Sequence, residues 1–131
     1  MEPRPVPAVI AVVHRGDAVL LVRRGCPPNA GAWGFPGGKI ELGEGLRAAA
    51  ERECLEETGV RCAAVRVLDC LDAISEGGWH YVLVAVLCDW REGDPVAGDD
   101  AAEARWVPLA ALDDWPGLIA EVARIARMPR A

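Results

Sequence analysis

The sequence predicts an α/β fold in which helices cover both faces of a mixed β-sheet. Three observations predict it: short aliphatic and β-branched runs typical of strands, two longer helical segments placed between and after them, and turn residues at the boundaries. At 131 residues and 52% hydrophobic composition, the chain is large enough to bury a core and too short for two domains. We therefore expect a single domain over residues 1–131.

The first half of the chain predicts a hairpin, a loop and a helix. Residues 8–13 and 18–22 are strand-like runs on either side of a Gly-containing turn. Residues 26–34 are rich in Pro and Gly, which favours a loop. Strong helix formers follow Leu46, and Gly59 lies where a left-handed C-terminal cap would end a helix.

The second half predicts more strands and a terminal helix. The predicted strands are residues 60–74, 79–90 and 105–107, of which the first two are joined by a Ser/Gly-containing turn. Residues 92–102 form a polar, acidic loop, Pro108 opens a short helix, and residues 116–127 predict the last helix.

Composition disfavours several classes of protein. The net charge of −6 argues against a nucleic-acid polymer as partner, because such binding depends on neutralising phosphates with Lys and Arg. No long apolar run and no basic-then-apolar amino terminus are visible, so we expect a cytoplasmic protein with no membrane partner. The five cysteines lack Cys-x-x-Cys spacing and their number is odd, which predicts reduced thiols that fill the core.

Three glutamates crowd the last turns of the helix that follows Leu46. Glu53, Glu56 and Glu57 occupy positions i, i+3 and i+4 and so share one face. Their mutual repulsion and the negative end of the helix dipole each cost about 0.3–1 kcal/mol. A hard cation such as Mg²⁺ reverses that sign, since it binds oxygen ligands and commonly joins carboxylates to substrate phosphates. The cluster predicts a divalent-metal site, and Arg52, four residues before Glu56, is placed to steady one carboxylate.

Residues 38–60, GKIELGEGLRAAAERECLEETGV, resemble the Nudix box, G-x5-E-x7-R-E-U-x-E-E-x-G-U, in which U is aliphatic. The fixed positions of the box are occupied by Gly38, Glu44, Arg52, Glu53, Glu56, Glu57 and Gly59. Cys54 occupies one U position, where a buried thiol behaves as a small hydrophobe. Residues 33–38 and 104–107 also resemble the family. The resemblance implies the α/β/α sandwich of the Nudix fold, with the box as a loop-helix-loop motif.

The resemblance also implies metal-dependent hydrolysis of a diphosphate. The metal is expected to be Mg²⁺, with Mn²⁺ as an alternative, held by Glu53, Glu56 and Glu57 and, as the resemblance adds, by the backbone carbonyl of Gly37. Arg52 is expected to orient the carboxylates. The catalytic candidates are Glu44, Arg52, Glu53, Glu57, Asp100 and Glu103.

The general base is left open between two regions. Glu44 lies outside the carboxylate face of the helix and is either a base or a supporting group. Family members also place the carboxylate in a later loop before the Trp-containing strand, and here that loop contains Asp99, Asp100 and Glu103. A solvated turn is the alternative interpretation of this loop.

Substrate contacts are predicted from local charge and aromatic residues. Because the overall charge is negative, substrate phosphates must be met locally, and Arg23, Arg24 and Lys39 are candidates. Tyr81 is a candidate for stacking on a nucleobase, with core packing as the alternative.

Beyond the box, residues 80–84 and 97–107 resemble small bacterial Nudix proteins labelled ADP-ribose pyrophosphatases, which implies hydrolysis of ADP-ribose to AMP and ribose 5-phosphate. An alternative is a nucleoside triphosphate pyrophosphohydrolase that removes oxidised nucleotides. A third hypothesis is a non-catalytic sensor of a nucleotide sugar, which usually accompanies lost box residues, whereas the box here is intact. A small-molecule nucleoside diphosphate derivative is therefore the expected partner, and a homodimer stays open as an alternative to a monomer.

Overall fold

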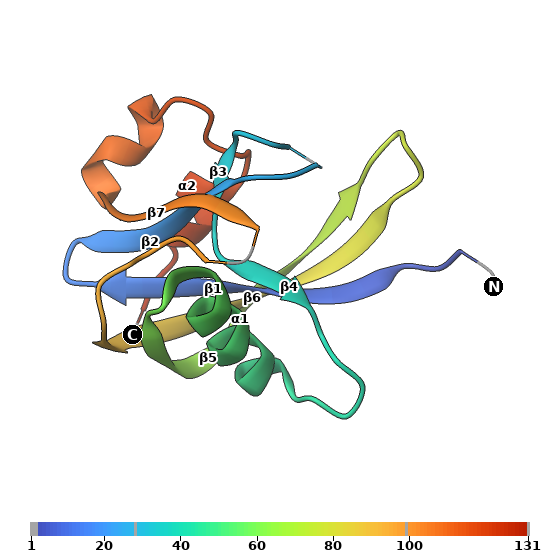
Figure 1. The fold of residues 1–131 in the computed structure, drawn as a ribbon, viewed down its shortest axis with the longest axis horizontal. Helices are drawn as coiled ribbons and strands as arrows, with labels where there is room; N and C mark the ends of the chain where they lie inside the picture. The colour runs from blue at the N-terminus through green and yellow to red at the C-terminus, as the bar shows by residue number, and fades with distance from the viewer. Residues whose placement is uncertain (1–2, 28, 99, 131) are drawn as a thin grey trace.

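A mixed β-sheet forms the centre of the protein (Figure 1). This computed structural model describes residues 3–27, 29–98 and 100–130. The strand order is β3-β2-β1-β6-β5, while β4 pairs with β1 and β7 pairs with β2. The strands are β1 (Val6–Arg15), β2 (Ala18–Arg24), β3 (Trp33–Gly34), β4 (Gly37–Lys39), β5 (Arg61–Ile74), β6 (His80–Glu92) and β7 (Ala101–Pro108). Among these pairings β1 and β6 run parallel and the others antiparallel, so the sheet is mixed, as predicted.

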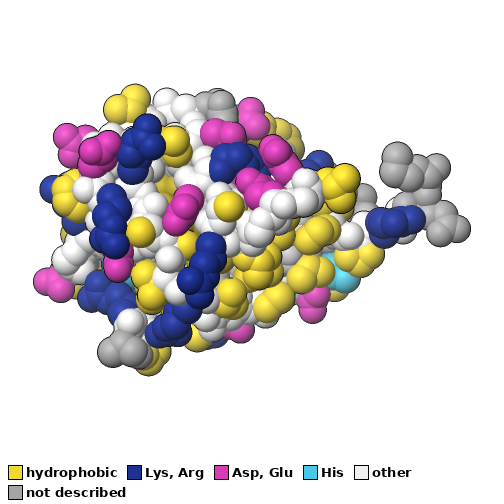
Figure 2. Space-filling model, turned by 90° about the horizontal axis from the view of Figure 1, so that it is seen from below, with side chains coloured by type: hydrophobic (Ala, Val, Ile, Leu, Met, Phe, Trp, Pro, Cys, Tyr) yellow, Lys and Arg dark blue, Asp and Glu magenta, His cyan; other side chains and the backbone are white. Residues whose placement is uncertain are grey.

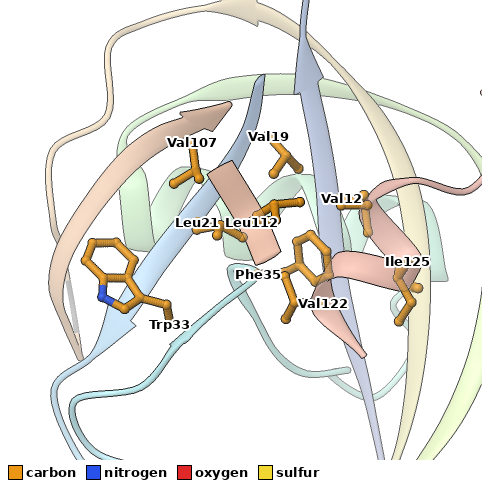
Figure 3. Packing of buried hydrophobic residues seen from close by; sticks show 11 residues of the cluster. Val12, Val19, Leu21, Trp33, Phe35, Val107, Leu112, Val122 and Ile125 are labelled. Carbon is orange, nitrogen blue, oxygen red and sulfur yellow. The ribbon is translucent and has the colours of Figure 1, made fainter. Parts of the chain in front are cut away.

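Helical segments cover both faces of this sheet. The α-helix α1 (Leu46–Thr58) packs on one face, and the 3₁₀ helix η1 (Leu109–Asp114) and the short α-helix α2 (Val122–Ala126) pack on the other. Alternation along β1 divides its side chains between two cores, with Val9 facing α1 and Val12 facing α2. Figure 3 shows the second core, in which Phe35 lies beside Val122. The predicted α/β/α arrangement is therefore confirmed.

The strands include those that the sequence pattern predicts and extend beyond them. Two short strands were not predicted: β3 forms at the end of the predicted loop 26–34, where Trp33 pairs with Arg23, and β4 forms where the box begins. The β1–β2 hairpin forms with His14 opposite Val19, and the β5–β6 hairpin closes with Ile74 opposite His80. Strand β7 begins at Ala101, earlier than the predicted residues 105–107, because its first residues pair with the end of β2. The end of the predicted acidic loop thus belongs to the sheet.

The terminal helix predicted over residues 116–127 is wrong in its first half, because α2 begins only at Val122. The preceding segment pairs with β3 instead: the Trp33 N–H donates to the Gly117 carbonyl at 2.9 Å, and the Ile119 N–H donates to the Trp33 carbonyl at 2.9 Å. Gly117 also has a φ of 75°, which ends helical backbone locally. Tertiary hydrogen bonds outweigh helix propensity here.

The surface combines mixed charge with one apolar region. On the face in Figure 2 acidic and basic side chains are interspersed and hydrophobic side chains gather in one area. The β5–β6 hairpin contributes four large exposed hydrophobic side chains: Val65 and Val67 along β5, and Ile74 and Trp79 at its turn. All five cysteines are free thiols, and Cys54 and Cys88 are buried. Across residues 3–130, omitting 28 and 99, every helix is too short or too polar to span a bilayer.

Because His14 is buried, we predict that the free energy of unfolding depends on pH. Its ring is 5% exposed on β1 and neither ring nitrogen has a hydrogen-bond partner among the described residues. Burial, followed by the charge of Arg130, lowers the pKa of His14 to about 4, although Asp89 opposes the shift. The unfolded chain, with a His pKa near 6.5, binds the proton more tightly.

The His14 contribution to stability should therefore be complete above about pH 6.5 and lost as the pH falls toward 4, by up to about 3 kcal/mol. Urea unfolding of the wild type and of His14→Leu across this range measures it, since carboxylate titrations are common to both proteins. Parallel pH dependences for the two proteins would contradict the assignment.

Candidate functional site

Helix α1 is oriented by its apolar face. Ala49, Ala50 and Cys54 are fully buried against the sheet, which leaves the glutamates on the opposite and lateral sides. The helix ends at Gly59, whose φ of 72° is left-handed and whose N–H donates to the Leu55 carbonyl at 2.9 Å. The predicted C-terminal cap is therefore confirmed, and it fixes where the acidic turn ends.

Arg52 binds several carboxylates at once. Its Nε and Nη2 donate to the two oxygens of Glu44 at 2.6 and 2.9 Å, a fork geometry that only Arg provides. Nη1 donates to Glu53 at 2.8 Å and to Glu56 at 3.2 Å, and Nη2 also donates to the Lys39 carbonyl at 3.1 Å. One guanidinium thus ties the loop before α1 to the acidic face of the helix.

This network gives the glutamates different protonation behaviour. The hydrogen bonds from Arg52 lower the pKa of Glu44 to about 2, so this carboxylate stays ionised with Arg52 across its two oxygens. Burial raises the pKa of Glu53, although Arg52 opposes the shift. A buried carboxylate with a raised pKa gains most from a nearby cation.

Two glycines let the backbone of β4 approach these carboxylates. A Cβ atom at Gly38 would overlap Glu53 Oε2, at 1.9 Å, and one at Gly37 would lie 2.2 Å from the Val9 carbonyl oxygen. The Gly37 N–H donates to Glu57 Oε1 at 3.3 Å. A side chain at position 37 would push β4 away from β1, so close approach there requires glycine, whereas a side chain at position 38 would displace the Glu53 carboxylate.

A cavity of about 810 Å³ opens beside this contact. Seven of the predicted site residues line it: Arg24, Gly37, Lys39, Glu53, Glu57, Tyr81 and Asp100. Phe35, Leu71 and Leu83 form part of its apolar wall. The lining of this one cavity therefore contains acidic side chains, two cationic side chains and apolar surface.

The other predicted residues lie outside the described lining of this cavity. Glu44, Arg52 and Glu56 form the network behind it. Glu103 lies opposite Arg23 in the β2–β7 register and forms ion pairs with Arg23, at 3.5 Å, and with Arg105. Arg23 and Glu103 thus form an ion pair with each other. Asp99, which the sequence analysis also named, lies outside the described residues.

The donor set fits a hard divalent cation. Glu53, Glu57 and Gly37 line the cavity together, and carboxylate and carbonyl oxygens are the ligands that Mg²⁺ and Mn²⁺ take. Within the described residues no three His, Cys, Asp or Glu side chains surround a common point, because Arg52 draws Glu53 and Glu56 toward its guanidinium. The residues fit the ion by their chemistry and by their place on the cavity.

Sequence reasoning missed much of the cavity wall. Residues 119–122, together with Cys26 and Asn29, line it although they carry no local motif. Glu121 and Asn29 are the two described non-glycine residues with positive φ, at 80° and 62°. Positive φ at a residue other than glycine is a signal that only the structure provides.

Comparison with known proteins agrees with this arrangement. The NUDIX domain model matches residues 4–126. The chain belongs to the Nudix hydrolase family. Nudix hydrolases act on nucleoside diphosphate derivatives and generally need a divalent metal.

Two relatives and one solved structure show which proteins this Nudix hydrolase is similar to. An "ADP-ribose pyrophosphatase" of Methanocaldococcus jannaschii is 31% identical over 80% of this chain and 63% of its own length. A Mycobacterium tuberculosis protein, "Putative 8-oxo-dGTP diphosphatase 2", is 40% identical over 88% of this chain and 86% of its own. The crystal structure of a MutT Nudix hydrolase from Burkholderia pseudomallei has a TM-score of 0.82 and 31% identity, covering 94% of this chain and 95% of that one.

Proposed function

We propose that this Nudix hydrolase cleaves the diphosphate bond of a nucleoside diphosphate linked to another moiety, with ADP-ribose as substrate and AMP and ribose 5-phosphate as products. One observation carries the proposal: a single cavity is lined by Glu53 and Glu57 of the box helix and by Asp100 of a distant loop. Such a site can hold a metal, a diphosphate and an attacking water together.

Each group has a separate task in the proposed reaction. Glu53, Glu56 and Glu57 hold the metal with the carbonyl of Gly37, and Arg52 orients the carboxylates. When bound, Mg²⁺, or Mn²⁺ in its place, stabilises charge on the phosphoryl oxygens and acidifies a bound water.

Asp100 and two cations complete the proposed site. A carboxylate oxygen of Asp100 accepts the proton of the attacking water, while Arg24 and Lys39 face the phosphate charge. Glu44 supports Arg52 rather than acting as the base, since Arg52 already donates to both of its oxygens.

Charge in the cavity favours a diphosphate over a triphosphate. Among its described lining residues two cations, Arg24 and Lys39, accompany four carboxylates, Glu53, Glu57, Asp100 and Glu121. A triphosphate brings more negative charge into this acidic space and needs more metal or cation to balance it. The apolar wall with Phe35 and Tyr81 offers surface for the adenine ring.

A second candidate is hydrolysis of an oxidised purine nucleoside triphosphate to a monophosphate and pyrophosphate. It is supported by the 40% identity to the mycobacterial protein, which extends over most of both chains. The reaction uses the same metal-binding residues, so only the substrate separates the two candidates.

A substrate panel tests the proposal. With Mg²⁺, and with Mn²⁺ in parallel, we expect ADP-ribose to yield AMP and ribose 5-phosphate, resolved by chromatography. A kcat/KM at least about a hundredfold higher for 8-oxo-dGTP than for ADP-ribose would replace the first candidate with the second. Tight binding without turnover of any compound would favour a non-catalytic sensor.

We propose further that residues 1–131 act as one domain in the cytoplasm on a small-molecule substrate, with no nucleic-acid or membrane partner. A homodimer remains the alternative to a monomer. Light scattering of the purified chain distinguishes the two states.

A further inference from the structure

Two glycines bracket the backbone of Asp100 at the edge of the cavity. We infer that Gly98 and Gly25 are positioning residues, which fix Asp100 relative to Glu57 of α1. The inference rests on the proposed function, in which Asp100 accepts the proton of the attacking water. Neither glycine has a positive φ, so backbone conformation does not require glycine at either position.

On one side, the loop before β7 is bonded to the end of α1. The Gly98 N–H donates to the Glu57 carbonyl at 2.8 Å, and the Val96 N–H donates to the Thr58 carbonyl at 2.8 Å. The last carbonyls of a helix have no partner within it, so these bonds satisfy them. A Cβ atom at position 98 would lie 2.5 Å from the Glu56 carbonyl oxygen, and only glycine allows the loop to approach this closely.

On the other side, the end of β2 binds the backbone of Asp100 itself. The Gly25 N–H donates to the Asp100 carbonyl at 2.9 Å, and a Cβ atom on Gly25 would lie 2.5 Å from that same oxygen. The Ala101 N–H donates to the Gly98 carbonyl at 3.0 Å and closes the turn between the two contacts. The backbone around Asp100 is therefore held to the end of α1 through Gly98 and to the end of β2 through Gly25.

Because the contact at Gly98 helps to fix the position of Asp100, its disruption should lower kcat. A general base must lie within hydrogen-bond reach of the water, and a misplacement of about 1 Å costs roughly a hundredfold in rate. A methyl group 2.5 Å from a carbonyl oxygen forces a shift of several tenths of an ångström or more. We expect Gly98→Ala to lower kcat by about 10- to 100-fold with a small change in KM.

A double-mutant cycle tests whether Gly98 acts through Asp100. The kcat of Gly98→Ala, Asp100→Asn and the double variant is measured with the substrate on which the wild type is most active. If Gly98 only positions Asp100, the loss caused by Gly98→Ala disappears in the Asp100→Asn background. An equal loss in both backgrounds, or wild-type kcat in Gly98→Ala, would overturn the inference.

Gly77→Ala is the matched control, because a Cβ atom there meets only Ser75 Oγ, at 3.7 Å, and the position lies in the β5–β6 turn, outside the described lining of the cavity. It should keep wild-type kcat. If Gly98→Ala fails to fold by circular dichroism, Gly25→Ala is carried through the same cycle from the opposite side of Asp100.

Amide hydrogen exchange separates this inference from the proposed function. Peptides covering residues 94–102 should lose protection in Gly98→Ala, while α1 and the sheet stay protected. If the wild type hydrolyses none of the compounds tested, the proposed function fails, and unchanged protection of residues 94–102 would independently overturn the positioning contact.

Discussion

Glu57→Gln is expected to lower kcat at saturating Mg²⁺ by at least about a thousandfold, because it removes a metal-binding charge from the cavity. The fold should survive, since Gln keeps the length of the side chain and an oxygen that accepts the Gly37 N–H, at 3.3 Å in the wild type. Steady-state kinetics over a Mg²⁺ titration measures the effect. The Mg²⁺ concentration for half-maximal rate should also rise.

The neighbouring carboxylate offers a comparison, and the same helix offers a control. Glu53→Gln should lose activity similarly, because it removes a second carboxylate whose charged form, disfavoured by burial, a bound cation would stabilise together with Arg52. Glu51→Gln should keep wild-type kcat, since Glu51 accepts the Ala64 N–H at 2.8 Å and lies outside the described cavity lining. Normal turnover by Glu57→Gln at ordinary Mg²⁺ would exclude it as a metal ligand.

Asp100→Asn should lower kcat by about 10² to 10⁴ with KM nearly unchanged, as expected for loss of a general base. Glu103→Gln should stay near wild type. The two acidic residues differ because Asp100 lines the cavity whereas Glu103 is engaged by Arg23 and Arg105 outside it. The same substrate and metal concentrations should be used for both variants.

Equal, full activity in both variants would mean that the loop is only a turn. Glu44→Gln would then be the next variant, although Arg52 donates to both oxygens of Glu44 and holds its pKa near 2. A loss of stability without a specific loss of kcat in Glu44→Gln would assign that residue a supporting role.

Local residue order was sufficient to predict the box helix and its acidic face. Spacing at i, i+3 and i+4 places Glu53, Glu56 and Glu57 together whatever the rest of the chain does. Gly59 marked the end of α1 because a left-handed cap depends on one residue. The aliphatic runs predicted the sheet for the same reason, since strand periodicity is local.

Pairings between distant residues could not be predicted in this way. The i, i+4 spacing pointed to Glu56 as the partner of Arg52, whereas the shorter contacts are with Glu44, across the loop before α1. Arg23 was predicted to contact a substrate phosphate, and no local pattern indicated its ion pair with Glu103, which lies opposite it in the β2–β7 register. Register depends on the whole sheet, and no short window of sequence specifies it.

The far wall of the cavity was missed for a related reason. A continuous helix was predicted over residues 116–127 because propensity describes an isolated segment. In the structure, hydrogen bonds between Trp33 and residues 117–119 hold that segment against β3, and residues 119–122 reach the cavity. The competing bonds come from a strand far earlier in the chain.

The parallel pairing of β1 with β6 has a consequence for how the chain folds. Val9 lies beside Val84 at the middle of the sheet, although β2, α1 and β5 are all made between them. Pairings between residues so distant in the chain close long loops and slow folding. During synthesis the box helix emerges before β6, so part of the sheet against which its apolar side packs is still missing. That side is exposed to aggregation until β6 has been made. A fragment that ends before β6 should therefore retain the complete box sequence and still fail to assemble the site.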